Sequence, residues 1–262
     1  MIGFNGGLIG SIRTPIAGVS IPGMWTPREQ ECAVRGGNWV AFATDPDYNS
    51  VSLLLHGDGT NGSQTFLDNS PRVKTLTAFG TAQISTAIVP KFGVSSLLFD
   101  NSRFNYITAP SNTDFAFGTG DFCVEAWIYQ RSQSQYAALL EIGNHQTNTG
   151  ILFITGSNGF QIYSNAFIGG SGNPLTLNVW QHVAYSRSGT TLRVFLNGIQ
   201  QGSNATFSNN LSVTTNVSIG FAATTASTDY DFDGYIDDIR VTKGVPRYTA
   251  NFPVPTEAFP NS

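Results

Sequence analysis

Charged side chains are scarce in this sequence of 262 residues. Asp, Glu, Lys and Arg make up 11% of the chain, against roughly 25% in an ordinary soluble domain. Helices draw on Ala, Glu and Lys for their solvent-facing positions, yet only 3 lysines and 5 glutamates are present. The net charge of −4 comes without a basic block or stripe. The shortage disfavours a helical protein and nucleic-acid binding through phosphate contacts.

Cysteine is scarce as well, and long apolar runs are missing. Cys32 and Cys123 lie far apart, so no disulfide framework is implied, and Cys123 is expected to be a buried free thiol in a strand. No apolar run approaches the ~18 residues of a membrane span. The opening MIGFNGGLIGSIRTP has neither the basic start nor the unbroken apolar segment of a secretory signal. We therefore expect synthesis and folding in a reducing cytoplasm.

Recognisable catalytic and metal-binding motifs are lacking too. The histidines at 56, 145 and 182 show no metal-ligand spacing, and neither a Gly-x-Ser-x-Gly elbow nor a phosphate loop occurs. We expect the three histidines to be structural.

Asn, Gly and Thr supply most of the polarity, and they suit turns and strands. Short strand-like runs follow one another from about residue 50, separated by turn clusters, and Asn197-Gly198 is a strong two-residue hairpin signal. This pattern predicts an all-β sandwich or barrel. The runs are 52–56, 97–100, 104–108, 122–129, 139–142, 151–155, 160–163, 179–187, 191–196, 217–221 and 234–242.

Residues 1–47 differ in composition from residues 48–262. They are rich in Gly and Pro, and WTPREQECAVRGG predicts one short helix with a capping box and a glycine stop. The segment is too short for a core of its own. We expect an anchoring arm ordered on a partner through Phe4, Leu8 and Trp25; a ragged terminus is the alternative. The proline-rich C-terminal tail is expected to run extended over the surface or along a partner.

Five motifs in order carry a resemblance to a known family: LLLHGDGTNGSQTFLDNSP, KFGVSSLLFDNSRFNYITAP, FAFGTGDFCVEAWIY, NVWQHVAYSRSGTTLRVFLNGIQ and GYIDDIRVTKGVPRYTANF. Together they resemble the laminin-G-like, concanavalin A-like jelly-roll domain over roughly residues 50–255. The resemblance implies two packed antiparallel sheets of about six or seven strands each. It also implies binding of glycans or proteins.

The ending DDIRVTKG-x-x-RYT-x-NF is similar to those of bacteriophage virion proteins, and the opening GFNGGLIG also looks like a phage structural-protein start. This resemblance implies a decoration, tail or fibre protein, made in the host cytoplasm and located in the virion. Other virion proteins are then the expected partners, and repeated copies favour a homo-oligomer.

Relatives often hold calcium between the turn after the first strand and the last strand, which makes Asp58, Asp68, Asp237 and Asp238 the candidate ligands. Strand alternation sends the last two to opposite faces. The alternative partners of these carboxylates are Arg240 and the backbone N–H groups of a turn.

Sugars stack on exposed aromatic rings, and the loop aromatics Tyr136, Phe167, Tyr230 and Phe232 are the candidate ligand-binding residues. Glycosidases of this fold resemble one another in a strand motif with several carboxylates, since retaining chemistry needs two of them close together. Here Glu125 stands alone in its strand, where a neighbouring hydroxyl or Arg would bind it.

We therefore expect a non-enzymatic phage virion structural protein that displays a lectin-like jelly roll. A lectin module for host attachment is the second hypothesis, and a glycan-cleaving enzyme is the third.

Overall fold

The computed structural model describes residues 44–262 apart from 103, 158, 172–174, 213–214 and 226. The predicted N-terminal helix and the predicted anchors Phe4, Leu8 and Trp25 lie outside the described residues. The compact unit begins at Asp45, slightly before the predicted boundary at residue 48.

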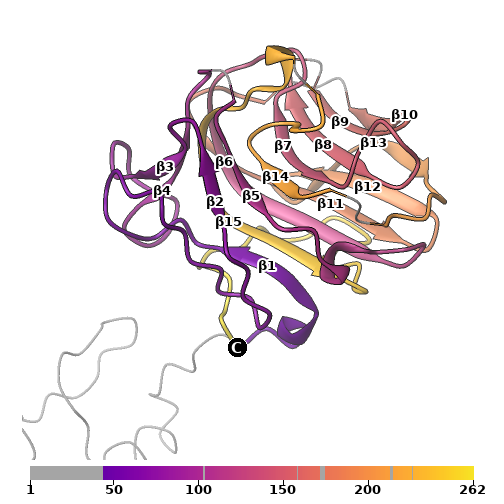
Figure 1. Ribbon diagram of the computed structural model, residues 1–262. Helices are drawn as coiled ribbons and strands as arrows, with labels where there is room; N and C mark the ends of the chain where they lie inside the picture. The colour runs from indigo at the N-terminus through magenta and orange to yellow at the C-terminus, as the bar shows by residue number, and fades with distance from the viewer. Residues whose placement is uncertain (1–43, 103, 158, 172–174, 213–214, 226) are drawn as a thin grey trace, which may run out of the picture. The chain divides into compact units, whose positions relative to one another are not determined.

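Two antiparallel sheets pack face to face, as predicted for a jelly-roll sandwich (Figure 1). The eight-stranded sheet has the order β13 (Ile199–Thr206), β12 (Thr191–Leu196), β11 (Trp180–Ser188), β6 (Phe122–Ser132), β15 (Asp233–Lys243), β4 (Ser96–Phe99), β3 (Gln83–Ser85), with β1 (Val51–Leu55) also paired to β15. The seven-stranded sheet has the order β10 (Ala166–Ser171), β9 (Gly159–Ser164), β8 (Ile151–Gly156), β7 (Ala138–Ile142), β14 (Val217–Ile219), β5 (Tyr106–Ala109), β2 (Thr77–Phe79). Helical structure among the described residues is confined to the 3₁₀ turns η1 (Tyr48–Ser50), η2 (Thr113–Phe115) and η3 (Thr228–Tyr230).

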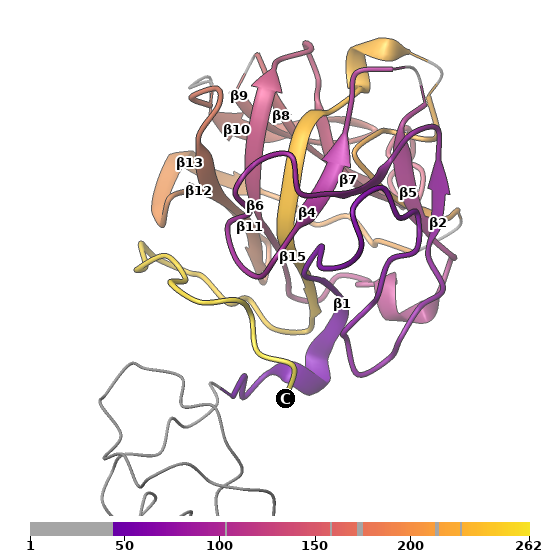
Figure 2. The ribbon, with the colours of Figure 1, turned by 90° about the vertical axis from the view of Figure 1, so that its left-hand side faces the viewer.

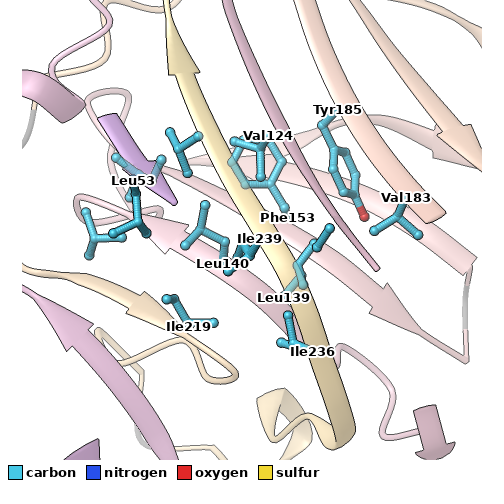
Figure 3. Close-up of a cluster of buried hydrophobic side chains, with 14 of the residues drawn as sticks. Leu53, Val124, Leu139, Leu140, Phe153, Val183, Tyr185, Ile219, Ile236 and Ile239 are labelled. Carbon is cyan, nitrogen blue, oxygen red and sulfur yellow. The ribbon is translucent and has the colours of Figure 1, made fainter. Parts of the chain in front are cut away.

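Alternate residues of the central strands fill the space between the sheets. Val124 on β6 and Ile239 on β15 face Leu139 on β7 and Phe153 on β8 across the core (Figure 3). Tyr185 is fully buried there and donates its hydroxyl to the carbonyl of Ile154 at 2.7 Å, so the one polar atom of this large side chain is satisfied.

The Asn197-Gly198 turn joins β12 to β13 as predicted. Both residues adopt positive φ angles, 48° and 76°, which is the geometry that a two-residue hairpin requires. A Cβ at Gly198 would lie 2.0 Å from the carbonyl oxygen of Phe252, because the C-terminal tail passes directly over this turn.

The two ends of the described chain meet. The backbone N–H of Asp45 donates to the carbonyl of Ser262 at 2.7 Å. Figures 1 and 2 both show η3 at the end of the sandwich away from the C-terminus. The sandwich therefore has one end where the chain enters and leaves, and a far end built from loops.

Candidate functional site

The outer face of the eight-stranded sheet carries a buried ionic network centred on Glu125. Arg240, its cross-strand partner, donates to Glu125 from Nε at 3.0 Å and from Nη2 at 2.8 Å. The Tyr248 hydroxyl donates to the second carboxylate oxygen at 2.7 Å. Burial alone would raise the pKa of Glu125, but Arg240 and His182 hold it well below its usual range. The prediction that an Arg or a hydroxyl binds this carboxylate is confirmed.

Asp45 completes this network from the N-terminal side. Its carboxylate receives Arg240 Nη1 at 3.0 Å and Arg247 Nη2 at 2.6 Å. All three side chains are less than one-tenth exposed. Two buried guanidinium groups therefore depend on two carboxylates, one from β6 and one from the segment before β1.

The C-terminal tail covers this face of the sheet (Figure 2). Tyr248 and Phe252 stack with ring centroids 3.5 Å apart, and both contact His182 on β11. The guanidinium of Arg240 lies 3.7 Å from the centroid of the Phe259 ring. The tail thus runs over the domain's own surface, one of the two courses that the sequence predicted.

The four acidic residues proposed for calcium do not converge. Asp68 accepts backbone N–H groups of Leu54, Ser70 and Lys74 at 3.1, 2.9 and 2.8 Å, so a turn's amides satisfy it. Throughout the described part of the chain, we find no group of three His, Cys, Asp or Glu side chains arranged to hold a metal ion.

Asp58 and Asp237 both accept hydrogen bonds from the backbone of one short loop, residues 91–94. Asp237 accepts the N–H groups of Lys91 and Phe92 at 2.8 and 3.0 Å, and Asp58 accepts that of Val94 at 2.8 Å. The other oxygen of Asp237 is buried and has no hydrogen-bond partner. Burial, with the neighbouring Asp238 and Asp58 charges, raises the pKa of Asp237 to about 7.

The prediction that Asp237 and Asp238 point to opposite faces is wrong. Asp238 occupies a bulge in the pairing of β15 with β6 and has a φ of 49°, and a bulge interrupts strand alternation. Its carboxylate pairs with His56 and accepts the N–H of Phe259 at 2.7 Å. Burial alone would lower the pKa of His56, but the hydrogen bond and charge of Asp238 raise it.

The outer face of the seven-stranded sheet carries aromatic rings instead. Cross-strand register places one row of side chains across this face, and the row runs Thr77, Thr108, Ser218, Glu141, Leu152, Tyr163, Phe167. Phe167 is 59% exposed. Tyr136 and Tyr230 stack on each other with ring centroids 5.3 Å apart. These two and Tyr163 pack over a small apolar layer that includes Leu152 and Ile154. We call Tyr136, Tyr163, Phe167 and Tyr230 the aromatic face.

A buried histidine–carboxylate pair lies under the aromatic face. His145 Nδ1 is 2.5 Å from Glu141 Oε1, and the His145 ring centroid is 5.7 Å from that of Tyr163 and 5.9 Å from that of Tyr230. Glu141 also accepts the N–H of Thr224 at 3.1 Å and its hydroxyl. The pair therefore fastens the loop before η3 to β7 and orients the rings above it.

Of the predicted ligand-binding residues, Tyr136, Phe167 and Tyr230 lie on the aromatic face. Phe232 does not, because its ring is fully buried and packs against Phe99 between the sheets; its assignment as a ligand contact is wrong. Tyr163 also lies on this face, although it was not among the predicted residues. Its strand alternates large apolar and polar residues, so the period of two assigns it to the outer face.

Comparisons with known proteins agree with this architecture. The family model described as the concanavalin A-like lectin/glucanases superfamily matches residues 101–246. A search of curated protein sequences finds no relative. Among solved structures, domain 4 of AbnA, a GH43 extracellular arabinanase from Geobacillus stearothermophilus, in complex with arabinotriose, is similar at a TM-score of 0.56 and 15% identity. The match covers 74% of this chain and 93% of that one.

Several other similar structures are binding domains of toxins. The binding domain of botulinum neurotoxin DC, in complex with rat synaptotagmin II, has a TM-score of 0.55 at 13% identity. The match covers 76% of this chain and 49% of the toxin domain, so this chain corresponds to about half of it. At these identities the similarity establishes the fold alone. Within the described residues, no helix is long and apolar enough to cross a membrane.

Proposed function

Because this chain belongs to the concanavalin A-like lectin/glucanases superfamily, we propose that it is a non-catalytic carbohydrate-binding domain carried by a bacteriophage virion structural protein. The observation that carries the binding function is the aromatic face. Tyr side chains offer an apolar ring with a polar tip, which suits the mixed apolar and hydroxylated surface of a sugar. Two of its rings, Tyr136 and Tyr230, are joined at the far end of the sandwich, where η3 lies.

The position of the chain ends supports display of this face. Asp45 and Ser262 are hydrogen-bonded to each other, so any attachment through residues 1–44 or beyond the tail enters at one end. A decoration, tail or fibre protein has this organisation when one end is anchored and the other is exposed. The arm with Phe4, Leu8 and Trp25 would supply the anchor, and copies on a symmetric particle would form a homo-oligomer whose avidity strengthens weak single-site binding.

The phage assignment rests on the sequence motifs at the two ends of the chain, and the carbohydrate assignment on the aromatic face. The arabinotriose complex of the similar arabinanase domain is a precedent for a sugar ligand on this fold. The proposal thus joins the two hypotheses: carbohydrate binding is the role of the domain, and the virion is where it is carried. Calcium stays a prediction, with Asp58 and Asp237 as the candidate pair.

A glycosidase role has no support at Glu125. The carboxylate is fully buried, forms a pair with Arg240 and is covered by Tyr248 from the tail. Retaining and inverting glycosidases both need two carboxyl groups that reach the substrate.

Glycan-array binding by the full chain tests the proposal. We expect binding that is lost in Tyr163→Ala and retained in Phe79→Ala, which removes an aromatic ring of 42% exposure on β2 of the same sheet. If the folded protein bound no glycan on the array, only a structural role would remain for the domain. Localisation in particles, and loss of incorporation when residues 1–43 are deleted, tests the virion part.

A further inference from the structure

Among the described residues, the charged groups beside the aromatic face are acidic. The ionisable neighbours that raise the pKa of Tyr230, after burial itself, are Tyr136, Tyr163, Asp229 and Glu141. Asp229 is exposed on η3 and its backbone carbonyl accepts the N–H of Tyr136 at 2.9 Å. In the described ranges, no lysine or arginine forms a hydrogen bond, ion pair or ring contact with the aromatic face or with the Glu141–His145 pair.

The described basic side chains lie elsewhere. Lys74 pairs with Asp114, Arg131 with Asp233, and Arg240 with Glu125. Lys91 lies 3.8 Å from the Trp127 ring centroid on the other sheet. Four others bind groups of the eight-stranded sheet or of loops: Arg72, Arg187, Lys243 and Arg247. Arg193 lies on β12 of the eight-stranded sheet.

The Glu141–His145 pair adds no positive charge to this surface. With a neutral imidazole the pair carries one negative charge, and with a protonated one it is neutral overall. Glu141 accepts hydrogen bonds from Thr224 and His145, and Ser218 Oγ lies 3.4 Å from it. Its oxygens are therefore occupied within the protein, and what the face offers a ligand is aromatic rings beside acidic groups.

We infer that the aromatic face selects uncharged saccharides over sialylated or uronic-acid saccharides. This inference rests on the proposed carbohydrate-binding function and names its ligand class. An anionic sugar stacked on these rings would lose water beside Asp229 and Glu141 without gaining a cationic partner. An uncharged sugar loses only hydroxyl hydration, which the tyrosine hydroxyls can replace.

A matched comparison tests the ligand class. The full chain is titrated calorimetrically with galactotriose and trigalacturonic acid, a pair of equal length that differs in its C6 groups. It is also titrated with lactose and sialyllactose, which adds one acidic sugar, and with arabinotriose. We expect binding of one or more uncharged probes and about tenfold weaker binding of each acidic counterpart. Tyr230→Ala should abolish binding, and Phe79→Ala should leave it unchanged.

Asp229→Asn probes the electrostatic cause, because the amide oxygen can still accept the Ser227 hydroxyl that Asp229 accepts at 3.0 Å. The variant should raise the affinity for the acidic probe about threefold. Equal or tighter binding of acidic probes by the wild-type chain would overturn the inference and leave the carbohydrate function intact. No binding of any probe or array saccharide by folded protein would instead overturn the proposed function itself. An unchanged acidic affinity in Asp229→Asn would contradict the charge explanation.

Discussion

His145 Nδ1 lies 2.5 Å from Glu141 Oε1 beneath the aromatic face. The same relationship recurs at the other two histidines, since His56 pairs with Asp238 and His182 Nε2 lies 3.3 Å from Glu125. Each imidazole therefore lies beside a buried carboxylate, as expected for structural histidines. In the first pair, however, the carboxylate also holds the loop that carries the candidate ligand-binding rings.

Replacing Glu141 with Gln should destabilise the domain. The amide keeps the size of the side chain but removes the charge and one acceptor, and Thr224 and His145 lose part of their hydrogen bonding. We expect a loss of about 2–4 kcal/mol in the free energy of unfolding, measured by urea denaturation. Asp229→Asn, at an exposed carboxylate, is the control and should stay within about 0.5 kcal/mol. Equal effects of the two substitutions would contradict the role assigned to Glu141.

Asp45 should mark the functional start of the domain. A chain beginning at residue 44 should melt at the wild-type temperature, whereas one beginning at residue 48 leaves Arg247 and part of Arg240 without their carboxylate. Asp45→Ala in the full chain should cost about 3–5 kcal/mol, because a buried ion pair loses one partner. Urea denaturation and thermal melts of the three proteins measure this. If the chain from residue 48 were as stable as the chain from residue 44, the buried network would not contribute as described.

Asp237 should make stability depend on pH. Its pKa is about 7 in the folded protein, against an ordinary value of 3.8. Between these values the folded state binds more protons than the unfolded state, so this group's contribution to stability falls as pH rises from 4 to 7. Above pH 7 the full penalty, roughly 2–4 kcal/mol, is present.

Asp237→Asn should remove that penalty. The amide oxygen can still accept the N–H groups of Lys91 and Phe92, while its NH₂ group faces the neighbouring carboxylates. We expect the variant to be more stable than wild type at pH 8, by a difference that shrinks as the pH falls and disappears near pH 4, in unfolding titrations across this range. A constant difference between the two proteins at all pH values would contradict the assignment.

Gly198 should tolerate alanine much less than Gly189. Both have positive φ angles, 76° and 58°, so both substitutions carry a similar backbone cost of about 1 kcal/mol. Only at Gly198 would the added Cβ meet the Phe252 carbonyl, whereas nothing lies within 4 Å at Gly189. Chemical denaturation should show a loss for Gly198→Ala that exceeds that of Gly189→Ala by roughly 1–3 kcal/mol. Equal losses would mean that the tail moves aside without cost.

The calcium prediction is tested at the same pair of carboxylates. If a cation binds between Asp58 and Asp237, millimolar calcium raises the melting temperature at pH 8, a chelator reverses the shift, and Asp237→Asn abolishes it. Magnesium at equal concentration is the control for ionic strength. A melting temperature that calcium does not change would reject the site.

The sequence alone predicted the central strands and the hairpin, because those strands alternate core and outer residues. It failed at the sheet edges: β2, β3 and β10 match no predicted run, and β13 was indicated only by its turn. These four lie at the ends of the two sheets. β1 also pairs with a single strand, but its five residues are all buried and its apolar run was predicted. An edge strand has fewer neighbours and buries less, as the exposed side chains of β13 show, so its pattern carries little hydrophobic signal.

The candidate site divides in the same way. An aromatic side chain in or near a predicted loop was the criterion that selected Tyr136, Phe167 and Tyr230, and it selected Phe232 equally well. Only tertiary structure separated them, because burial of Phe232 depends on Phe99 from a distant strand. The bulge at Asp238 and the register that aligns Glu141 with Tyr163 across β8 likewise come from strand pairing. Local sequence thus determined which segments form strands and which of their side chains alternate between core and outer positions. Contacts between distant segments decided which outer face the tail covers and which one exposes its aromatic rings.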